Sequence, residues 1–318
     1  MWPMEDYPRV LREFEARFCT ERACAEYVFR LRWPEGFVCR ACGHHGGWVT
    51  GNGRVICTAC RSRTTVTAGT IFHDTHQPLV IWFRAMWWMT NQKTGLSALG
   101  LQRLLGLGSY RTAWTMLHKL RSAMVRPGRD RLTGTIEVDD TYWGAPEPGV
   151  RGRGAEKKAL IVVAAEEDGH GIGRIRMGPV ADASASSLHA FIEQTTEPGS
   201  TIHTDAWSGY QGLETKGYRH VVTPVKHSGK SAHELLPRVH KAISLLKRWL
   251  MGTHQGATSH EHLSSYLDEF VFRFNRRTSA HRGKLFLRLA QQAVAVEPLP
   301  YACLAKGVRQ SRDHRHNT

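Results

Sequence analysis

The order of β-rich and helical runs after residue 133 most constrains the fold of this chain. Three stretches of short apolar alternation predict consecutive strands: GTIEVDD, KKALIVVAAEE and IGRIRMGPV. Two further strands, STIHTD and YRHVVTPV, each follow a helical segment, and two amphipathic helices close the region. This β-β-β-α-β-α-β-α order predicts an α/β domain with a mixed sheet, which we place at residues 133–290.

Two cysteine pairs define the region before that domain. Cys39 and Cys42 form one CxxC pair, and Cys57 and Cys60 form a second one after 14 intervening residues. Four thiolates close a tetrahedral zinc site with no open position, so the site is structural. Residues 35–72 are therefore expected to form a zinc ribbon with one Zn²⁺. The alternative is a set of four structural or oxidised cysteines.

The rest of the N-terminal part has helical periodicity. Residues 1–34 form an N-terminal helical segment, residues 73–126 form a second helical region, and residues 291–318 read as a C-terminal tail. Two helical patterns meet at GLGS, with Ser109 as an N-cap, which predicts a helix-turn-helix. Arg111 would then lie at the start of the second helix and contact DNA. An ordinary helical hairpin is the alternative.

Charge indicates the kind of partner. The net charge is +15 and the sequence pI is about 9.8, which favours a polyanion, with nucleic acid ahead of an anionic membrane. The chain lacks an apolar run of the roughly 18 residues that a membrane span needs, and its N-terminus lacks a signal-peptide pattern. We therefore expect a soluble cytoplasmic protein with DNA, and no membrane, as its partner.

Two aspartates are the candidate catalytic residues. Strand alternation places Glu137 and Asp139 on one face and Asp140 on the other, and Asp205 ends the fourth strand. A buried, unpaired carboxylate is costly, and metal coordination supplies a reason for one. Hard oxygen ligands suit Mg²⁺, and two ions about 4 Å apart serve phosphoryl transfer. The alternatives are a solvent-facing turn for Asp139 and a helix N-cap for Asp205.

These stretches together resemble bacterial insertion-sequence transposases of the DDE superfamily, in the group with an N-terminal zinc ribbon. The matching segments are CRAC, CTAC, IEVDDTYWG, HTDAWSGY, LLKRWLMGTHQG and HLSSYLDEFVFRFNRR. The strand order is also that of a ribonuclease H-like catalytic domain. The resemblance implies binding of element ends and target DNA, joining of cut 3′-hydroxyls to the target, a homo-oligomer on DNA and a bacterial, nucleoid-associated location. Asp139 and Asp205 match the first two catalytic acids.

The third acid departs from the family pattern. The expected helix carries His240, thirty-five residues after Asp205, where the family has Glu and some members have Asn or His. As the third ligand to Mg²⁺ or Mn²⁺, a histidine would favour manganese more than an all-carboxylate set does. A histidine that faces solvent or phosphate is the alternative, and Glu234 and Glu261 are weaker candidates. Lys247, two turns and about 10 Å further along the helix, matches a family lysine expected near the scissile phosphate; it could also be one lysine of a basic helix.

Further basic residues are expected to follow DNA phosphates. They are Arg151, Arg153, Lys157, Lys158, Arg248, Arg273, Arg276 and Arg277. Three functions stay open from the residues: an active transposase, a ribonuclease H-like nuclease or catalytically weak descendant, and a zinc-ribbon DNA-binding regulator without catalysis. The paired aspartates favour the first over the third, because a regulator has no use for them.

Overall fold

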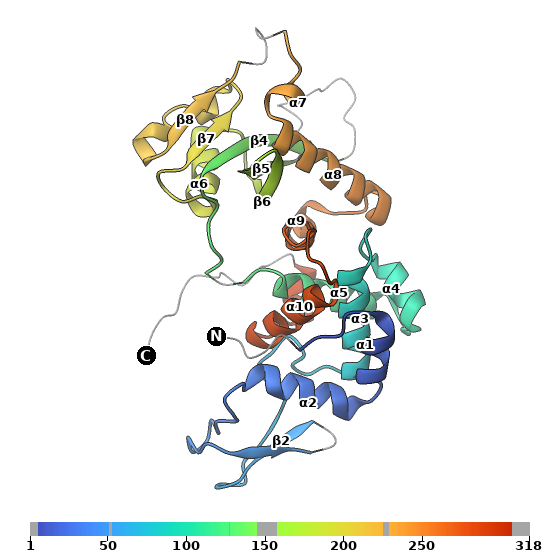
Figure 1. Ribbon diagram of the computed structural model, residues 1–318. Coiled ribbons are helices and arrows are strands. Elements are labelled where there is room, and N and C mark those ends of the chain that lie inside the picture. Colours follow the sequence, from blue (N-terminus) through green and yellow to red (C-terminus); the bar gives the residue numbers. More distant parts are fainter. Residues whose placement is uncertain (1–5, 51–52, 127, 145–157, 225–228, 307–318) are drawn as a thin grey trace. The chain divides into compact units, whose positions relative to one another are not determined.

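The computed structural model describes residues 6–50, 53–126, 128–144, 158–224 and 229–306, and the chain divides into two compact units (Figure 1). The N-terminal unit comprises Met1–Pro127 and Thr278–Thr318, and the sheet unit comprises Gly128–Arg277. None of the helices in the described ranges is long and apolar enough to cross a membrane.

The N-terminal unit is mostly helical and also contains a small three-stranded sheet of order β1-β2-β3. Its elements are α1 (Leu11–Arg17), α2 (Glu21–Arg32), β1 (Gly47–Val49), β2 (Arg54–Cys57), β3 (Arg63–Thr65), α3 (Leu79–Asn91), α4 (Ala98–Leu105), α5 (Tyr110–Ala123), α10 (Gly283–Ala295) and α11 (Tyr301–Ala305). Its core is aromatic: Phe286 of α10 packs against Phe14, Phe18 and Phe83, with ring centroids 5.4–5.6 Å apart.

Local signals set the predicted helix–turn–helix connection. Gly106 adopts the left-handed conformation (φ 62°) and ends α4, as a residue without a Cβ does readily. Ser109 then caps α5 by accepting a hydrogen bond from the N–H of Thr112 at 3.1 Å. The turn and the cap are those expected from the sequence.

The sheet unit contains the mixed sheet that the sequence predicts, in the order β6-β5-β4-β7-β8. Its elements are β4 (Thr135–Trp143), β5 (Ala159–Asp168), β6 (Gly171–Val180), α6 (Ala185–Thr195), β7 (Thr201–Thr204), η1 (Ser208–Tyr210), η2 (Leu213–Lys216), β8 (Arg219–Val222), α7 (Ala232–Leu235), α8 (Pro237–His254) and α9 (His260–Phe274). The first three strands pair antiparallel, and β4, β7 and β8 pair in parallel. This is the ribonuclease H-like arrangement expected for the domain.

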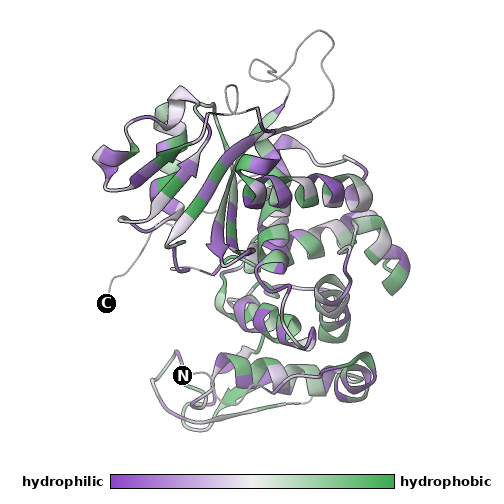
Figure 2. Cartoon of the chain, turned by 45° about the horizontal axis from the view of Figure 1, so that its top comes forward, coloured by the Kyte–Doolittle hydropathy of each residue, from purple (hydrophilic) through white to green (hydrophobic). Residues whose placement is uncertain are grey.

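Residue alternation divides the sheet into two faces. Ile136 and Val138 of β4 and Ile202 of β7 join the core beneath α6, whereas Ile161 and Val163 of β5 join the core beneath α8 and α9. Figure 1 shows α6 and α8 on opposite sides of the sheet, and Figure 2 shows hydrophilic and hydrophobic residues interleaved along the elements. Because the side-chain period of a strand is two, Glu137 and Asp139 of β4 and Asp205 after β7 fall on the α8 side.

Several sequence expectations differ from the structure. Residues 206–217 form two short 3₁₀ helices instead of one helix, with Gly212 (φ 88°) between them. In the zinc ribbon, β1 and β2 pair antiparallel between the two cysteine pairs, and β3 adds a third strand that was not expected. The catalytic domain was expected to end at 290, but the compact unit ends at Arg277 and α10 packs in the N-terminal unit, through aromatic contacts that no local pattern encodes.

Candidate active site and metal centre

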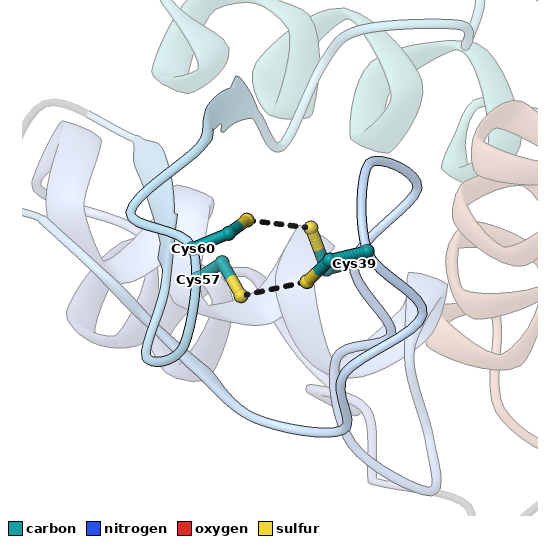
Figure 3. A group of neighbouring side chains, drawn as sticks. Cys39, Cys57 and Cys60 are labelled. Atoms are coloured by element: carbon teal, nitrogen blue, oxygen red, sulfur yellow. Dashed lines mark hydrogen bonds between the residues drawn. The ribbon is translucent and has the colours of Figure 1, made fainter.

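The four predicted cysteines form one cluster (Figure 3). The Sγ atoms of Cys39 and Cys60 lie 3.7 Å apart, those of Cys42 and Cys57 lie 3.8 Å apart, and all four lie within 4.8 Å of one another. A Zn–S bond of about 2.3 Å in a tetrahedron gives sulfur atoms roughly 3.8 Å apart, so the cluster fits zinc. The Ser62 hydroxyl bonds the Cys39 thiol and lowers its pKa to about 6, whereas hydrogen bonds with the other thiols raise the pKa of Cys42 to about 12.

The two predicted acids follow the same paired position on β4 and β7. The two strands pair in parallel with Glu137 opposite His203, and Asp139 and Asp205 each come two residues after that pair. The side chain of Asp139 is only 14% exposed. Asp205 follows the last residue of β7, and its Oδ1 accepts the N–H of Trp207 at 3.0 Å. That bond fixes the turn after the strand and leaves Oδ2 as a further acceptor.

His240 comes to the same place from α8. Its Nε2 lies 3.4 Å from Oδ2 of Asp139. Burial lowers the pKa of His240, and the carboxylates of Glu137 and Asp205 oppose that shift. The shift favours the neutral imidazole, which is the metal-binding form. The structure therefore brings together all three residues that the sequence proposed as catalytic ligands.

Lys247 also lies near the acids. Desolvation lowers the pKa of Lys247, while Asp139 acts in the opposite direction and Lys158 adds to the lowering. The ammonium groups of Lys247 and Lys158 are thus close enough to interact with each other and with the site. Arg248, the next residue of α8, is exposed. Arg151, Arg153 and Lys157 lie outside the described residues.

The three arginines at the end of α9 have partners within the chain. Arg273 is only 8% exposed and lies 3.6 Å from the carboxylate of Glu269. It is therefore not accessible to a DNA phosphate, contrary to the expectation from the sequence. Arg276 stacks on Phe272 at 4.0 Å. Arg277 stacks on Phe274 and donates to the carbonyl oxygens of β6. The sequence could not distinguish these roles because guanidinium groups serve both equally well.

Arg111 lies at the start of α5 as predicted, with its guanidinium 3.9 Å from the ring centroid of Tyr301. Together with Lys119 and Tyr301 it lines a cavity of about 430 Å³ within the N-terminal unit. The Arg111 guanidinium therefore makes a cation–π contact with Tyr301 beside α5, and its charge is still available to an anionic partner.

Three residues with clear roles were missed from the sequence. Asn275 makes a two-way amide pair with Ile175 of β6, accepting the N–H of Ile175 at 2.7 Å and donating to its carbonyl at 3.1 Å. Glu137 and Arg238 join β4 to α8 directly ahead of the candidate ligands. The role of Glu137 could have been suspected from the start of α8, where the N-cap is Leu236 and no local side chain caps the helix. A helix start without a local cap needs an acceptor from elsewhere in the chain.

Family models match both parts of the chain. Residues 131–275 match an ISXO2-like transposase domain, and residues 19–63 match a transposase zinc-ribbon domain. A protein of transposable element ISH50 from Halobacterium salinarum, described as uncharacterized, is 26% identical over 280 residues, which cover 80% of this chain and 91% of that protein.

Two solved structures are distant neighbours. One is a cryo-EM structure of a simian T-cell lymphotropic virus intasome in complex with PP2A regulatory subunit B56 gamma, with 16% identity, coverage of 72% of this chain and 78% of that one, and a TM-score of 0.30. The other is a pre-cleavage Mos1 transpososome, with 10% identity, coverage of 66% and 78%, and a TM-score of 0.26. At these TM-scores neither supports an argument about this chain.

Proposed function

Because this chain belongs to the insertion-sequence transposases that combine a zinc ribbon with an ISXO2-like domain, we propose that it binds the ends of its element and carries out metal-dependent DNA cleavage and strand transfer. The observation that carries the proposal is the meeting of Asp139, Asp205 and His240 on one side of the sheet. Such an activity would place the protein at the nucleoid.

The residues at this site fit divalent cations. Asp139 and Asp205 supply hard oxygen donors, and His240 supplies a neutral nitrogen. Two ions of Mg²⁺ or Mn²⁺, when bound, supply the positive charge that activates an attacking hydroxyl and stabilises a leaving oxygen. In the described structure the four cysteines are the group that meets the spacing for a single ion, so Asp139, Asp205 and His240 are proposed as ligands from their chemistry and from the contact between Asp139 and His240.

The neighbouring basic residues act on the DNA backbone. Lys247, held near Asp139, contacts a phosphate next to the scissile bond, and Lys158 and Arg248 extend that positive surface. The N-terminal unit, with its zinc ribbon and helix–turn–helix, recognises the element ends, and the assembled complex is a homo-oligomer on DNA. The net charge of +15 makes affinity fall steeply with salt.

The test is strand transfer in vitro. Full-length protein is incubated with a linear DNA that carries the inverted repeats flanking its gene, a target plasmid and Mg²⁺ or Mn²⁺. Asp139→Asn and Asp205→Asn should each lower the joining rate by more than about a hundredfold, because losing a metal ligand raises the activation free energy by several kcal/mol. Both should still bind the DNA ends, because the recognition surface is unchanged.

Asp140→Asn is the matched control. Asp140 neighbours Asp139, but alternation turns it to the α6 face, so this variant should keep joining activity. Wild-type joining by either Asp139→Asn or Asp205→Asn would show that the metal site lies elsewhere. Cleavage without any joining in the wild-type protein would instead identify a nuclease.

A further inference from the structure

Helix α8 begins without a cap of its own. Its N-cap residue is Leu236, which has no side-chain acceptor, although the first N–H groups of a helix have no partner within the helix. Pro237 carries no N–H, and the N–H of His240 bonds the carbonyl of Leu236 at 3.2 Å. The N–H groups of Arg238 and Val239 remain, and both need an external acceptor.

Glu137 supplies that acceptor from β4. Its Oε2 accepts the N–H of Arg238 at 2.7 Å and the N–H of Val239 at 2.9 Å, and its Oε1 accepts Nη1 of Arg238 at 3.0 Å. The Glu137 side chain is 3% exposed. A carboxylate at a helix N-terminus also meets the positive end of the helix dipole. Both oxygens are occupied, so Glu137 is not free to bind a cation although it shares a strand face with Asp139.

Arg238 extends this contact to the turn between β5 and β6. Its guanidinium donates to the carboxylate of Glu167 and to the carbonyl oxygens of Gly169 and Gly171. Hydrogen bonds and ion pairs therefore join the start of α8 to β4, β5 and β6. Asp139 lies two residues after Glu137, and His240 lies two residues after Arg238. The same strand and the same helix thus meet twice, first at Glu137 with Arg238 and then at Asp139 with His240.

We propose that Glu137 is a positioning residue that sets the first turn of α8 against β4 and so holds His240 within reach of Asp139. The inference rests on the proposed function, in which His240 is the third metal ligand. Outer residues that orient a ligand typically change metal affinity by about 10–100-fold when mutated.

The experiment measures Mn²⁺ binding to the full-length protein by electron paramagnetic resonance, so it does not depend on strand transfer. Glu137→Gln keeps the size of the side chain, but its amide has one acceptor oxygen where the carboxylate has two, so it cannot accept both the backbone N–H groups and Nη1 of Arg238 in the observed arrangement. It also removes the negative charge at the helix N-terminus. It should weaken Mn²⁺ binding by about tenfold or more. Hydrogen exchange should also become faster at the amides of Arg238 and Val239. Glu167→Gln is the matched control, because it removes an outer contact of Arg238 and leaves Glu137 in place, and it should change Mn²⁺ affinity by less than about threefold.

A double-mutant cycle separates positioning from general loss of charge or stability. If Glu137 acts through His240, Glu137→Gln should cost no further Mn²⁺ affinity in a His240→Ala background. An equal loss in both backgrounds would overturn the inference, as would wild-type Mn²⁺ affinity in Glu137→Gln. Wild-type affinity in His240→Ala alone would instead refute the third-ligand role in the proposed function.

Arg238→Met provides a second route if Glu137→Gln does not fold. It keeps both backbone donors to Glu137 and removes the guanidinium that ties α8 to β4 and to the β5–β6 turn. It should weaken Mn²⁺ binding severalfold in the wild-type background and not in the His240→Ala background. Equal binding by Arg238→Met and wild type would overturn the inference.

Discussion

Acidic residues in the sheet unit have different roles because different groups face them. Glu137 meets the start of a helix, Asp139 meets His240, and Glu166 of β5 meets Arg174 of β6. The sequence places all three in strands, and alternation assigns their faces. The sequence does not tell which carboxylate is neutralised by an arginine and which is left for the proposed metal, since that depends on groups brought in from distant segments.

Glu166 gives a prediction about acid stability. Burial alone would raise its pKa, but hydrogen bonds from Arg174 and from the N–H of Thr133 outweigh this effect, and the pKa lies below its ordinary value of 4.5. Since the folded-state pKa is depressed, the stabilisation is complete above the unfolded-state value and is lost as pH falls through the folded-state value. Glu166→Gln should therefore cost about 1–3 kcal/mol of unfolding free energy near neutral pH.

Urea denaturation of Glu166→Gln and wild type at about pH 7.5 and about pH 3 checks this expectation, and the difference should shrink at the lower pH. Glu193→Gln is the control, because its pair with Lys216 is largely exposed and should contribute under about 1 kcal/mol. A difference for Glu166→Gln that persists unchanged in acid would contradict the role of its charge.

His240 gives a prediction about metal preference. His240→Ala should lose strand transfer, and His240→Glu should retain part of it with a shift from Mn²⁺ toward Mg²⁺, because a carboxylate is the harder ligand. Joining rates of both variants in both metals provide the measurement. A histidine that only contacts phosphate predicts the reverse order, with Glu below Ala in both metals, because an added negative charge repels DNA.

At the element scale, the sequence predicted what depends on neighbouring residues. Ser109 caps α5 as expected, and the five strands follow the expected order along the chain. Each of these depends on residues a few positions apart. The sequence missed α7, where Ser231 and Glu234 form a capping box, and it did not foresee that Glu137 would cap α8 from another strand, because that pairing spans about a hundred residues.

The zinc ribbon gives a prediction at this scale. Its three strands have three or four residues each and bury little apolar surface, so metal binding should supply much of its folding free energy. Full-length protein should contain one zinc per chain, and Cys42→Ser should lose it together with protection of residues 35–66 from proteolysis. Elemental analysis and limited proteolysis provide the measurement.

The control is Cys19→Ser, which changes an exposed cysteine outside the cluster and should keep the metal. A Cys42→Ser protein that retains zinc and protection would argue for a metal-independent ribbon.

At the scale of the whole molecule, the chain leaves the N-terminal unit at Pro127 and rejoins it at Thr278. The sequence did not predict α10 (Gly283–Ala295): its residues up to 290 were expected in the α/β domain and the rest in the C-terminal tail. Its partner could not be read from the sequence either, because an amphipathic face fits many cores. The partner is the aromatic cluster of α1 and α3, and the N–H of Ile71 also bonds the carbonyl of Ala293 in α10 at 3.3 Å. The unit that we propose recognises DNA therefore depends on residues that come both before and after the sheet unit in the sequence.

That dependence gives a prediction for α10. Phe286 is fully buried, and Phe286→Ala should destabilise the N-terminal unit by about 3–5 kcal/mol, because it removes a large side chain and leaves a cavity among aromatic rings. Hydrogen exchange should rise in α1, α2 and α3 and stay unchanged in β4–β6, and binding to element ends should weaken. Phe274→Ala is the matched control, since Phe274 packs in the core beneath α8 and α9, and it should loosen those helices instead. If Phe286→Ala raised exchange in the sheet strands and spared α1 to α3, α10 would belong to the catalytic domain, as the sequence boundary at 290 implies.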